Sequence, residues 1–328
     1  MGGATASARH PRGFGLESAC SSTASGGAIA IQAPLSYAVV TPVRDEAESL
    51  PRLARCLASQ TLLPERWVIV DNGSTDATFV VAEQIAAEHG WADVITVSGT
   101  KRPARGGQVV RAFCAGMAAL GEAPDVVVKL DADVSFDPSH FERLVFAFAS
   151  NPSLGIASGA RCELSRGRWR RDAGTATTVE AQARAYRWGC LHDVLPLEDR
   201  MGWDVVDETK ALLAGWHTST IQDACFRHHR KMGARDRSRL SAWAAQGDVA
   251  RYTGYRFSYL LLRALYRMGR DPAAAMIVYG YLDATFGRRP VHPDSAVRAY
   301  RRRQQRLRHV PRRVAEAFGR TGERVRAR

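Results

Sequence analysis

Residues 126–133 read VVVKLDAD, a short run rich in β-branched residues that ends in two carboxylates one residue apart. The run predicts a buried strand, and residues two apart in a strand project to the same face. If strand geometry persists to the end, Asp131 and Asp133 point the same way from the carboxyl edge of a sheet. Ligands bind at this edge in open α/β sheets, and two carboxylates there suit Mg²⁺ or Mn²⁺. The alternative is a solvated turn in which an aspartate caps a helix.

The chain before this stretch alternates between short apolar runs and helical patterns. Strands are expected at 37–41, 67–70 and 94–97, and helices at about 46–59, 75–90 and 109–120. Regular alternation of strand and helix predicts a mostly parallel sheet with right-handed crossovers, flanked by helices. We therefore expect an α/β fold of the Rossmann-like type.

Acidic residues follow three of the expected strands, and all should converge on one rim of the sheet. They are Asp45 with Glu46, Asp71, and Asp131 with Asp133. The sequence has no G-x-G-x-x-G after the first strand, which disfavours a dinucleotide-binding fold.

Beyond the central stretch the pattern continues less regularly. We expect a helix at 138–150, a strand near 155–159, a basic loop at 161–171 and a helix at 179–191. A second acidic cluster at 204–208 begins a helix that ends at Gly215-Trp216. Residues 225–231, CFRHHRK, follow it.

Composition limits the class of protein. The 328 residues are 45% hydrophobic and carry a net charge of +13, which predicts a globular chain with an anionic partner. Six scattered cysteines without C-x-x-C pairs suit reduced thiols. No secretory signal and no apolar run of about 18 residues is present, so we expect a cytoplasmic protein, soluble or peripheral.

The two ends of the chain differ in character from the middle. Residues 1–35 are small and polar and are expected to be disordered. Apolar stretches within 252–286 carry interleaved arginine and tyrosine, which suits either a membrane-interfacial helix or a packed helical hairpin. Residues 298–328 hold twelve arginines against two glutamates. We therefore expect four parts: a disordered segment at 1–35, the main domain at 36–235, a helical extension at 236–297 and a basic tail at 298–328. Attachment to an anionic membrane leaflet is a hypothesis for the last two parts.

Three blocks in order, VVTPVRDE at 39–46, VDNGSTD at 70–76 and LDAD at 130–133, resemble the family 2 glycosyltransferases. These are GT-A fold enzymes that move a sugar from a nucleotide diphosphate. The resemblance covers residues 36–235, about two thirds of the chain. The part beyond Gly202 is similar to bacterial members that build extracellular or capsular polysaccharides.

The resemblance implies a role for each matching residue on the donor side. Thr41, Pro42, Arg44 and Glu46 match the loop around the base and ribose, and Asp71 matches the carboxylate that recognises the nucleobase. Asp131 matches the residue near the ribose, and it is also expected to be a second metal ligand. Asp133 matches the main ligand of Mg²⁺ or Mn²⁺.

On the acceptor side the chain departs from the family pattern. The family has Glu-Asp before a helix that ends in Gly-aromatic, and here Trp203 replaces the glutamate while Asp204 matches the catalytic aspartate. This leaves Asp207 as a rival base and Glu208 as a weaker one. His228 lies where some members supply a third metal ligand, and His229 is its alternative.

The resemblance implies metal-dependent transfer with inversion, from a nucleotide-diphosphate sugar, most often a UDP-sugar, to a saccharide or lipid-linked acceptor. The cell-surface pathway would place the protein at the inner face of the plasma membrane. Two alternatives remain: a nucleic-acid-binding protein that uses its basic surface, and an inactive glycosyltransferase-like scaffold. The acidic strand ends would repel nucleic acid, so no nucleic-acid partner is expected. A sugar nucleotidyltransferase would need a Gly-rich phosphate loop that is missing after the first strand.

Overall fold

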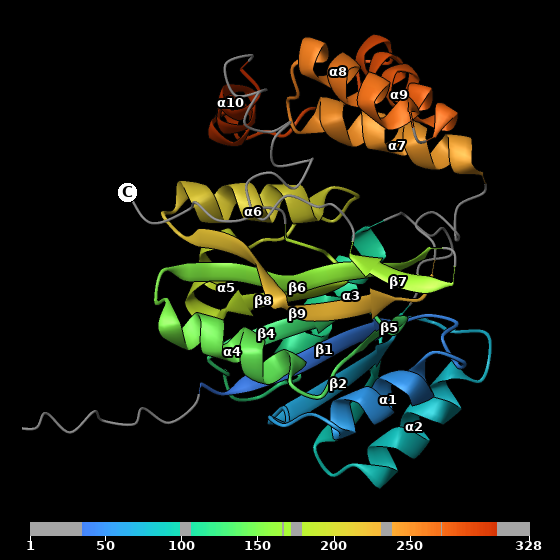
Figure 1. Ribbon diagram of the computed structural model, residues 1–328, viewed down its shortest axis with the longest axis vertical. Helices are drawn as coiled ribbons and strands as arrows, with labels where there is room; N and C mark the ends of the chain where they lie inside the picture. Colours follow the sequence, from blue (N-terminus) through green and yellow to red (C-terminus); the bar gives the residue numbers. More distant parts are fainter. Residues whose placement is uncertain are drawn as a thin grey trace, which may run out of the picture. The chain divides into compact units, whose positions relative to one another are not determined.

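The computed structural model describes residues 35–98, 106–165, 167–171, 179–230, 238–269 and 271–306. The expected disordered segment up to residue 34 and the arginine-rich tail from residue 307 lie outside the described residues. Within them, the strands form one sheet in the order β3-β2-β1-β4-β8-β6-β9-β5, with β7 paired to β6 (Figure 1). The strands are β1 (Tyr37–Val43), β2 (Arg66–Asp71), β3 (Ala92–Thr96), β4 (Val126–Leu130), β5 (Val134–Phe136), β6 (Leu154–Ser165), β7 (Arg168–Arg171), β8 (Ala183–Arg187) and β9 (His217–His228).

The first four strands confirm the expected parallel α/β half. β1 pairs in parallel with β2 and β4, and β2 with β3. Val43 lies opposite Asp71, and Val40 lies opposite Lys129. This register ends β1, β2 and β4 at one edge, so the residues that follow them meet at a common rim.

Ten α-helices and one 3-10 helix accompany the sheet within the described ranges. They are α1 (Leu50–Ala58), α2 (Thr78–Glu88), α3 (Gly107–Ala118), α4 (His140–Ser150), α5 (Trp188–Val194), α6 (Trp203–Leu213), α7 (Arg239–Tyr252), α8 (Phe257–Met268), η1 (Pro272–Ala275), α9 (Met276–Phe286) and α10 (Ser295–Gln304). The expected helices at 46–59 and 109–120 correspond to α1 and α3. Ser74 and Thr75 do not cap α2, which follows Ala77, because their hydroxyls bond to Asp71 and Asp45 instead.

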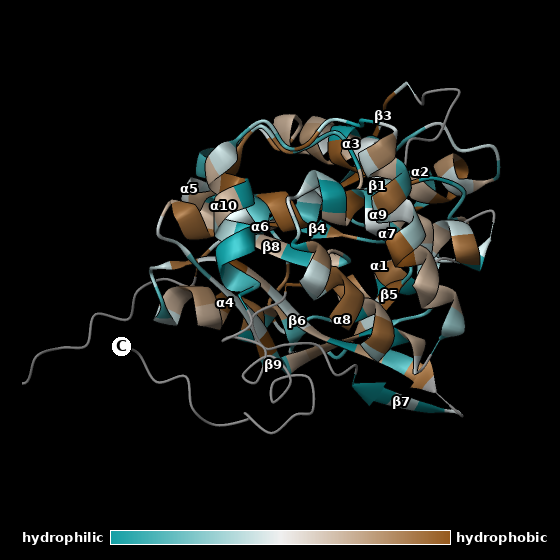
Figure 2. Ribbon diagram, turned by 90° about the horizontal axis from the view of Figure 1, so that it is seen from above, coloured by the Kyte–Doolittle hydropathy of each residue, from teal (hydrophilic) through white to brown (hydrophobic). Residues whose placement is uncertain are grey.

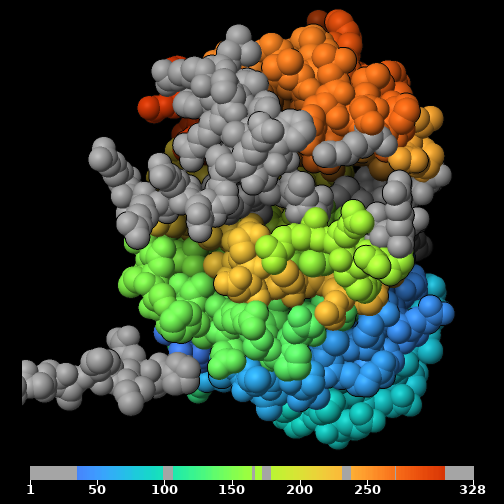
Figure 3. Space-filling view, in the orientation of Figure 1, coloured from blue at the N-terminus to red at the C-terminus, as the bar shows by residue number. Residues whose placement is uncertain are grey.

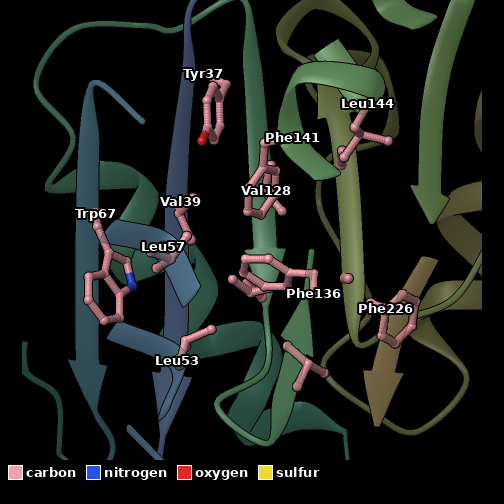
Figure 4. Packing of buried hydrophobic residues seen from close by; sticks show 14 of the residues in the cluster. Tyr37, Val39, Leu53, Leu57, Trp67, Val128, Phe136, Phe141, Leu144 and Phe226 are labelled. Carbon is pink, nitrogen blue, oxygen red and sulfur yellow. The ribbon is translucent and has the colours of Figure 1, made fainter. Parts of the chain in front are cut away.

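Two hydrophobic cores lie on opposite faces of the sheet. On one face, residues of α1, α2 and α4 pack on side chains such as Val39, Trp67 and Val128. Figure 4 shows this core, where the rings of Tyr37 and Phe141 stack with centroids 5.0 Å apart. On the other face, α3, α5 and α6 pack on the alternate residues of the same strands. Strands buried on both faces explain the unbroken apolar runs in the sequence.

The second half of the sheet corrects two expectations. The predicted basic loop at 161–171 is the end of β6 and the strand β7, which pair as an antiparallel hairpin. The predicted helix at 179–191 is mostly the strand β8, whose Ala183 and Ala185 join one core while Tyr186 joins the other, followed by the short helix α5. β9 was not expected from the sequence.

The C-terminal helices have a small core of their own. α7 and α9 approach closely where a Cβ on Gly280 would lie 1.9 Å from the carbonyl oxygen of Ala244, so only glycine fits there. Tyr252 Oη donates to Glu198 at 2.6 Å, and Arg200 Nη2 lies 2.9 Å from Asp248 Oδ2, which ties α7 to the loop before α6. Among the described residues, no helix combines the length and apolar character needed to cross a bilayer.

Candidate functional site at the carboxyl edge of the sheet

The loops after β1 and β2 hold one another at the rim. The amide of Thr75 donates to Asp45 Oδ1 at 2.7 Å, and the amide of Asp45 donates to Ser74 Oγ at 3.1 Å. The amide and hydroxyl of Ser74 both bond to the carboxylate of Asp71. Asp45 adopts a positive φ of 53°, a conformation that aspartate tolerates better than most residues. The interlocked loops fix Asp71, which is buried, at the end of β2.

Three residues of the β1 loop lie at different depths. Thr41 is fully buried, and its hydroxyl accepts a 2.9 Å hydrogen bond from Trp67 Nε1, so its side chain is in the core and not at the rim. Pro42 is half-buried at the end of β1. Arg44 reaches toward α3, where its Nη1 lies 3.5 Å from Gln108 Oε1.

Glu46 is the most tightly held residue of this loop. Its amide donates to Thr78 Oγ1 at 2.7 Å. Its buried carboxylate accepts two hydrogen bonds of 2.8 Å from the guanidinium of Arg230, a residue just past β9. Glu46 therefore connects the start of the sheet to the end of its last strand.

Asp133 lies at the centre of the second part of the site. His228 Nε2 lies 3.5 Å from Asp133 Oδ2, and Arg230 Nη1 lies 3.6 Å from the same oxygen. Pairing of β5 with β9, in which Val134 lies opposite His228, brings these distant residues together. Burial opposes ionisation, but contact with His228 and the charge of Arg230 hold the pKa of Asp133 below its usual value. The carboxylate is thus ionised and surrounded by groups that favour its charge.

Asp131 faces a different partner from Asp133. The buried ammonium of Lys129 binds the carboxylate of Asp131 and donates to the carbonyl of Ala181 at 3.0 Å. The Lys129 ammonium also lies 5.8 Å from the centre of the Trp203 ring. Asp131 is therefore at the rim, as predicted, with a cation of the protein already beside it.

Helix α6 presents its carboxylates in contrasting settings. Asp207 is buried and forms a two-point ion pair with Arg184, whose Nε and Nη2 lie 3.1 and 2.6 Å from the carboxylate oxygens. Tyr186 also donates its hydroxyl to Asp207. Within the described part of the chain, the half-buried Asp204 carboxylate has no hydrogen bond, and only its backbone carbonyl accepts one, from Arg184 at 3.0 Å. Asp204 has an available oxygen and Asp207 does not.

Burial also shifts the pKa values of two carboxyl groups on α6. Burial raises the pKa of Asp207 to about 6 and that of Glu208 to about 7, while the charge of Arg184 opposes both rises. Thr218 Oγ1 donates to Glu208 at 3.4 Å. Glu208 is therefore a mostly enclosed carboxyl, in contact with β9.

The side chains of His228, the last residue of β9, and of His229, which follows it, point to different partners. His229 turns to Ser135, with 2.7 Å between Nε2 and Oγ, and its ring meets Trp169 edge-on at 5.1 Å. His228 faces Asp133, and its Nδ1 is buried without a hydrogen-bond partner among the described residues. Of the two imidazoles, only that of His228 faces the Asp133 carboxylate, while His229 contacts Asp133 through its backbone amide, which donates to the Asp133 carbonyl at 2.9 Å.

A divalent ion is the cofactor that the sequence predicted. In the described part of the chain, no three His, Cys, Asp or Glu side chains gather into a metal site. Asp133 and His228 nevertheless fit as two neighbouring ligands, because Asp133 Oδ2 and His228 Nε2 lie 3.5 Å apart and the buried Nδ1 of His228 has no hydrogen-bond partner within the described residues. Mg²⁺ sites commonly use one or two protein ligands and take the rest from water and substrate phosphates.

Two residues of this site, Lys129 and Arg184, were not predicted from the sequence. Lys129 interrupts an apolar run immediately before Asp131, which is a readable signal for a partner of that carboxylate. Arg184 lies in ARAYR, where alternation of small and large residues indicates a strand rather than the helix that was expected. Arg184 pairs with Asp207 only because α6 packs near β8, and no local sequence pattern predicts this packing.

Comparison with known proteins gives a family for this arrangement. Residues 38–196 match the model of glycosyl transferase family 2. The structure is similar to a mannosyltransferase from Pyrobaculum calidifontis in complex with GDP-Man and Mn²⁺, with a TM-score of 0.53, 14% identity, and coverage of 88% of this chain and 85% of that chain. It is also similar to GalNAc-T7 with UDP, GalNAc and Mn²⁺, with a TM-score of 0.54, 12% identity, and coverage of 77% of this chain and 55% of that chain. No curated protein sequence matches the chain.

At these identities the two structures support the fold, and the family match supports the relationship. This chain therefore carries a family 2 glycosyltransferase domain, which has the GT-A fold.

Proposed function

We propose that this protein transfers a sugar, with inversion, from a nucleotide-diphosphate sugar to an acceptor hydroxyl. The observation that carries the proposal is the separation of two acidic centres in a family 2 domain. Asp133 lies among His228 and Arg230 at the rim, and Asp204 has an available carboxylate on α6. One centre suits a diphosphate and the other suits a proton acceptor.

On the donor side, we assign Asp71 to the nucleobase and Pro42 and Arg44 to the base and ribose. Thr41 can contribute only through its backbone, because its hydroxyl is bonded to Trp67 in the core. Asp131 is assigned to the ribose, since Lys129 fixes its carboxylate at the rim. Glu46 acts indirectly, by holding Arg230 beside Asp133.

Asp133 and His228 are the residues that would hold Mg²⁺ or Mn²⁺, with Asp131 nearby as a second carboxylate. A bound divalent ion neutralises the charge that develops on the leaving diphosphate. Arg230 adds a positive charge from the protein at the same place. The Mn²⁺ in both structural neighbours supports this choice of cofactor.

On the acceptor side, we assign Asp204 as the general base. Its carboxylate takes the proton of the acceptor hydroxyl as the oxygen attacks the anomeric carbon. Asp207 is a positioning residue, because Arg184 joins its carboxylate to the backbone of Asp204. Attack opposite the departing diphosphate inverts the anomeric configuration, as in inverting hydrolases.

For the donor and the acceptor we propose classes of compound. A UDP-sugar is the favoured donor, and GDP- and dTDP-sugars are the other candidates. The acceptor is a saccharide or a lipid-linked saccharide of cell-surface polysaccharide or glycolipid synthesis. We place the protein at the inner face of the plasma membrane, where lipid-linked acceptors are accessible.

Thermal unfolding with nucleoside diphosphates tests the donor site. UDP, GDP and dTDP are each added with and without Mn²⁺, and a ligand at a hundred times its Kd stabilises the fold by about 2.7 kcal/mol. We expect one nucleotide to raise the melting temperature in a Mn²⁺-dependent way, and Asp133→Asn to abolish that rise.

Asp137→Asn is the matched control, because Asp137 is an exposed carboxylate four residues away that pairs with Arg227. It should keep the nucleotide response. The donor site is contradicted if no nucleotide stabilises the protein or if Asp133→Asn responds like the wild type. Stabilisation by an oligonucleotide alone would favour the nucleic-acid-binding alternative.

A further inference from the structure

Helix α8 exposes an apolar face that is large for its length. Only Leu260 and Ala264 are buried in this helix, against α9 and η1. The exposed large hydrophobic residues are Phe257, Leu261, Leu262, Leu265, Tyr266 and Met268. Figure 2 shows α8 coloured largely as hydrophobic, and Figure 3 shows the surface of the C-terminal helices in orange. A cluster of this kind marks an interaction surface.

The charged side chains of α8 itself have one sign. Residues 256–269 contain three arginines, Arg256, Arg263 and Arg267, and no acidic residue. Arg256 Nε donates to the carbonyl of Arg302 at 2.9 Å, and the guanidinium of Arg263 lies 5.8 Å from the centre of the Tyr255 ring. These contacts hold two of the cations beside the helix without neutralising them with a carboxylate.

We propose that α8 docks on the surface of an anionic lipid bilayer. Its apolar side chains enter the boundary between headgroups and acyl chains, and its arginines lie at the lipid phosphates. Twelve residues span about 18 Å at 1.5 Å per residue, so the helix lies along the surface and does not cross it. Arginine, tyrosine and leucine on one short helix suit this interfacial position.

The charge argues against a second copy of the chain as the occupant. A two-fold contact through α8 would cover the apolar residues of both copies, but it would bring no carboxylate from the other copy's α8 to Arg256 or Arg263, because residues 256–269 contain none. Anionic lipid supplies the opposite charge and the apolar phase at once.

This inference narrows the proposed membrane location to one helix and separates it from the basic tail. It predicts that replacing apolar residues of α8 weakens binding to anionic vesicles even when every arginine of the chain is kept. Because vesicle binding requires no catalysis, its outcome is independent of the proposed sugar transfer.

Co-sedimentation of the full chain with vesicles tests the proposal. The vesicles are phosphatidylcholine alone, or phosphatidylcholine with phosphatidylglycerol. The test variant is Leu262→Gln with Leu265→Gln, whose side chains are 44% and 65% exposed. We expect wild-type protein to bind only the anionic vesicles and the double variant to bind them at least about tenfold more weakly, since apolar burial drives interfacial binding.

The control removes two exposed apolar residues elsewhere, Val80→Gln on α2 with Phe146→Gln on α4, which are 54% and 69% exposed. This control should bind anionic vesicles like the wild type. Equal vesicle binding by the α8 variant and the control overturns the proposal. So does a wild-type dimer that the α8 variant converts to monomer, with no vesicle binding by either.

Discussion

Arg230 holds Glu46 through both ends of its guanidinium, with two hydrogen bonds of 2.8 Å between residues 184 positions apart in the sequence. The same guanidinium lies 3.6 Å from Asp133. One cation therefore connects the loop after β1, the acidic end of β4 and the end of β9. The donor site is assembled by this connection as well as by the sheet.

Removing Arg230 should destabilise the protein. Arg230→Ala removes the two hydrogen bonds that the buried Glu46 carboxylate accepts from Arg230, which costs about 2–3 kcal/mol. Arg230→Lys keeps a charge but loses the two-point geometry, so it should recover only part of the loss. Urea unfolding measures both. An Arg230→Ala variant with the midpoint and slope of the wild type would show that the pair contributes nothing to the fold.

The two aspartates of α6 should differ in their contribution to the stability of the fold, with a large contribution from Asp207 and almost none from Asp204. Arg184→Met leaves Asp207 buried without its cation and should cost about 3–5 kcal/mol, and Asp207→Asn should also destabilise. Asp204→Asn should change stability by less than about 0.5 kcal/mol, since its carboxylate has no bond to lose within the described residues. Thermal unfolding of the three variants measures this. Equal loss in Asp204→Asn and Asp207→Asn would contradict the assigned roles.

His140 should make the fold sensitive to mild acid. The ring is buried against Phe136, and burial lowers the pKa of His140 to about 4. In the unfolded chain the pKa is about 6.5, so the unfolded state takes up a proton first as the pH falls. The stability that depends on neutral His140 is complete above about pH 6.5 and is lost as the pH falls toward 4.

His140→Phe tests this pH dependence because it keeps a ring of similar size. Unfolding free energies of the wild type and the variant are compared at pH 7 and pH 5. The wild type should lose more stability over this interval than the variant. An identical loss in both proteins would assign the acid sensitivity to other groups.

The first half of the fold and the acidic rim could be predicted from the sequence because both depend on local patterns. Each parallel strand is a continuous apolar run, and each run ends in a polar residue at the same edge. Asp71, Asp131 and Asp133 were placed at the rim by this rule alone. Thr41 was placed near the base and ribose by the family resemblance, and its burial beside Trp67 follows from a side-chain contact that the strand pattern does not reveal.

The second half depends on contacts between distant segments. β9 is long and polar, and it forms only because β6 and β5 lie on either side of it. Gly159 permits this approach, since a Cβ there would lie 1.8 Å from the carbonyl oxygen of Ala224. The helix expected at 179–191 is a strand because β4 and β6 pair with Ala183–Arg187.

The most direct test of the proposed chemistry is the release of nucleoside diphosphate by Asp204→Asn. Wild type and variant are incubated with Mn²⁺ and UDP-, GDP- or dTDP-sugars, with water in place of the acceptor. We expect the wild type to cleave one donor slowly. Asp204→Asn should lose at least about a hundredfold in rate, as general-base catalysis typically contributes, while its nucleotide-induced thermal shift remains. Release at the wild-type rate by Asp204→Asn, or loss only in Asp207→Asn, would contradict the assignment of Asp204 as the base.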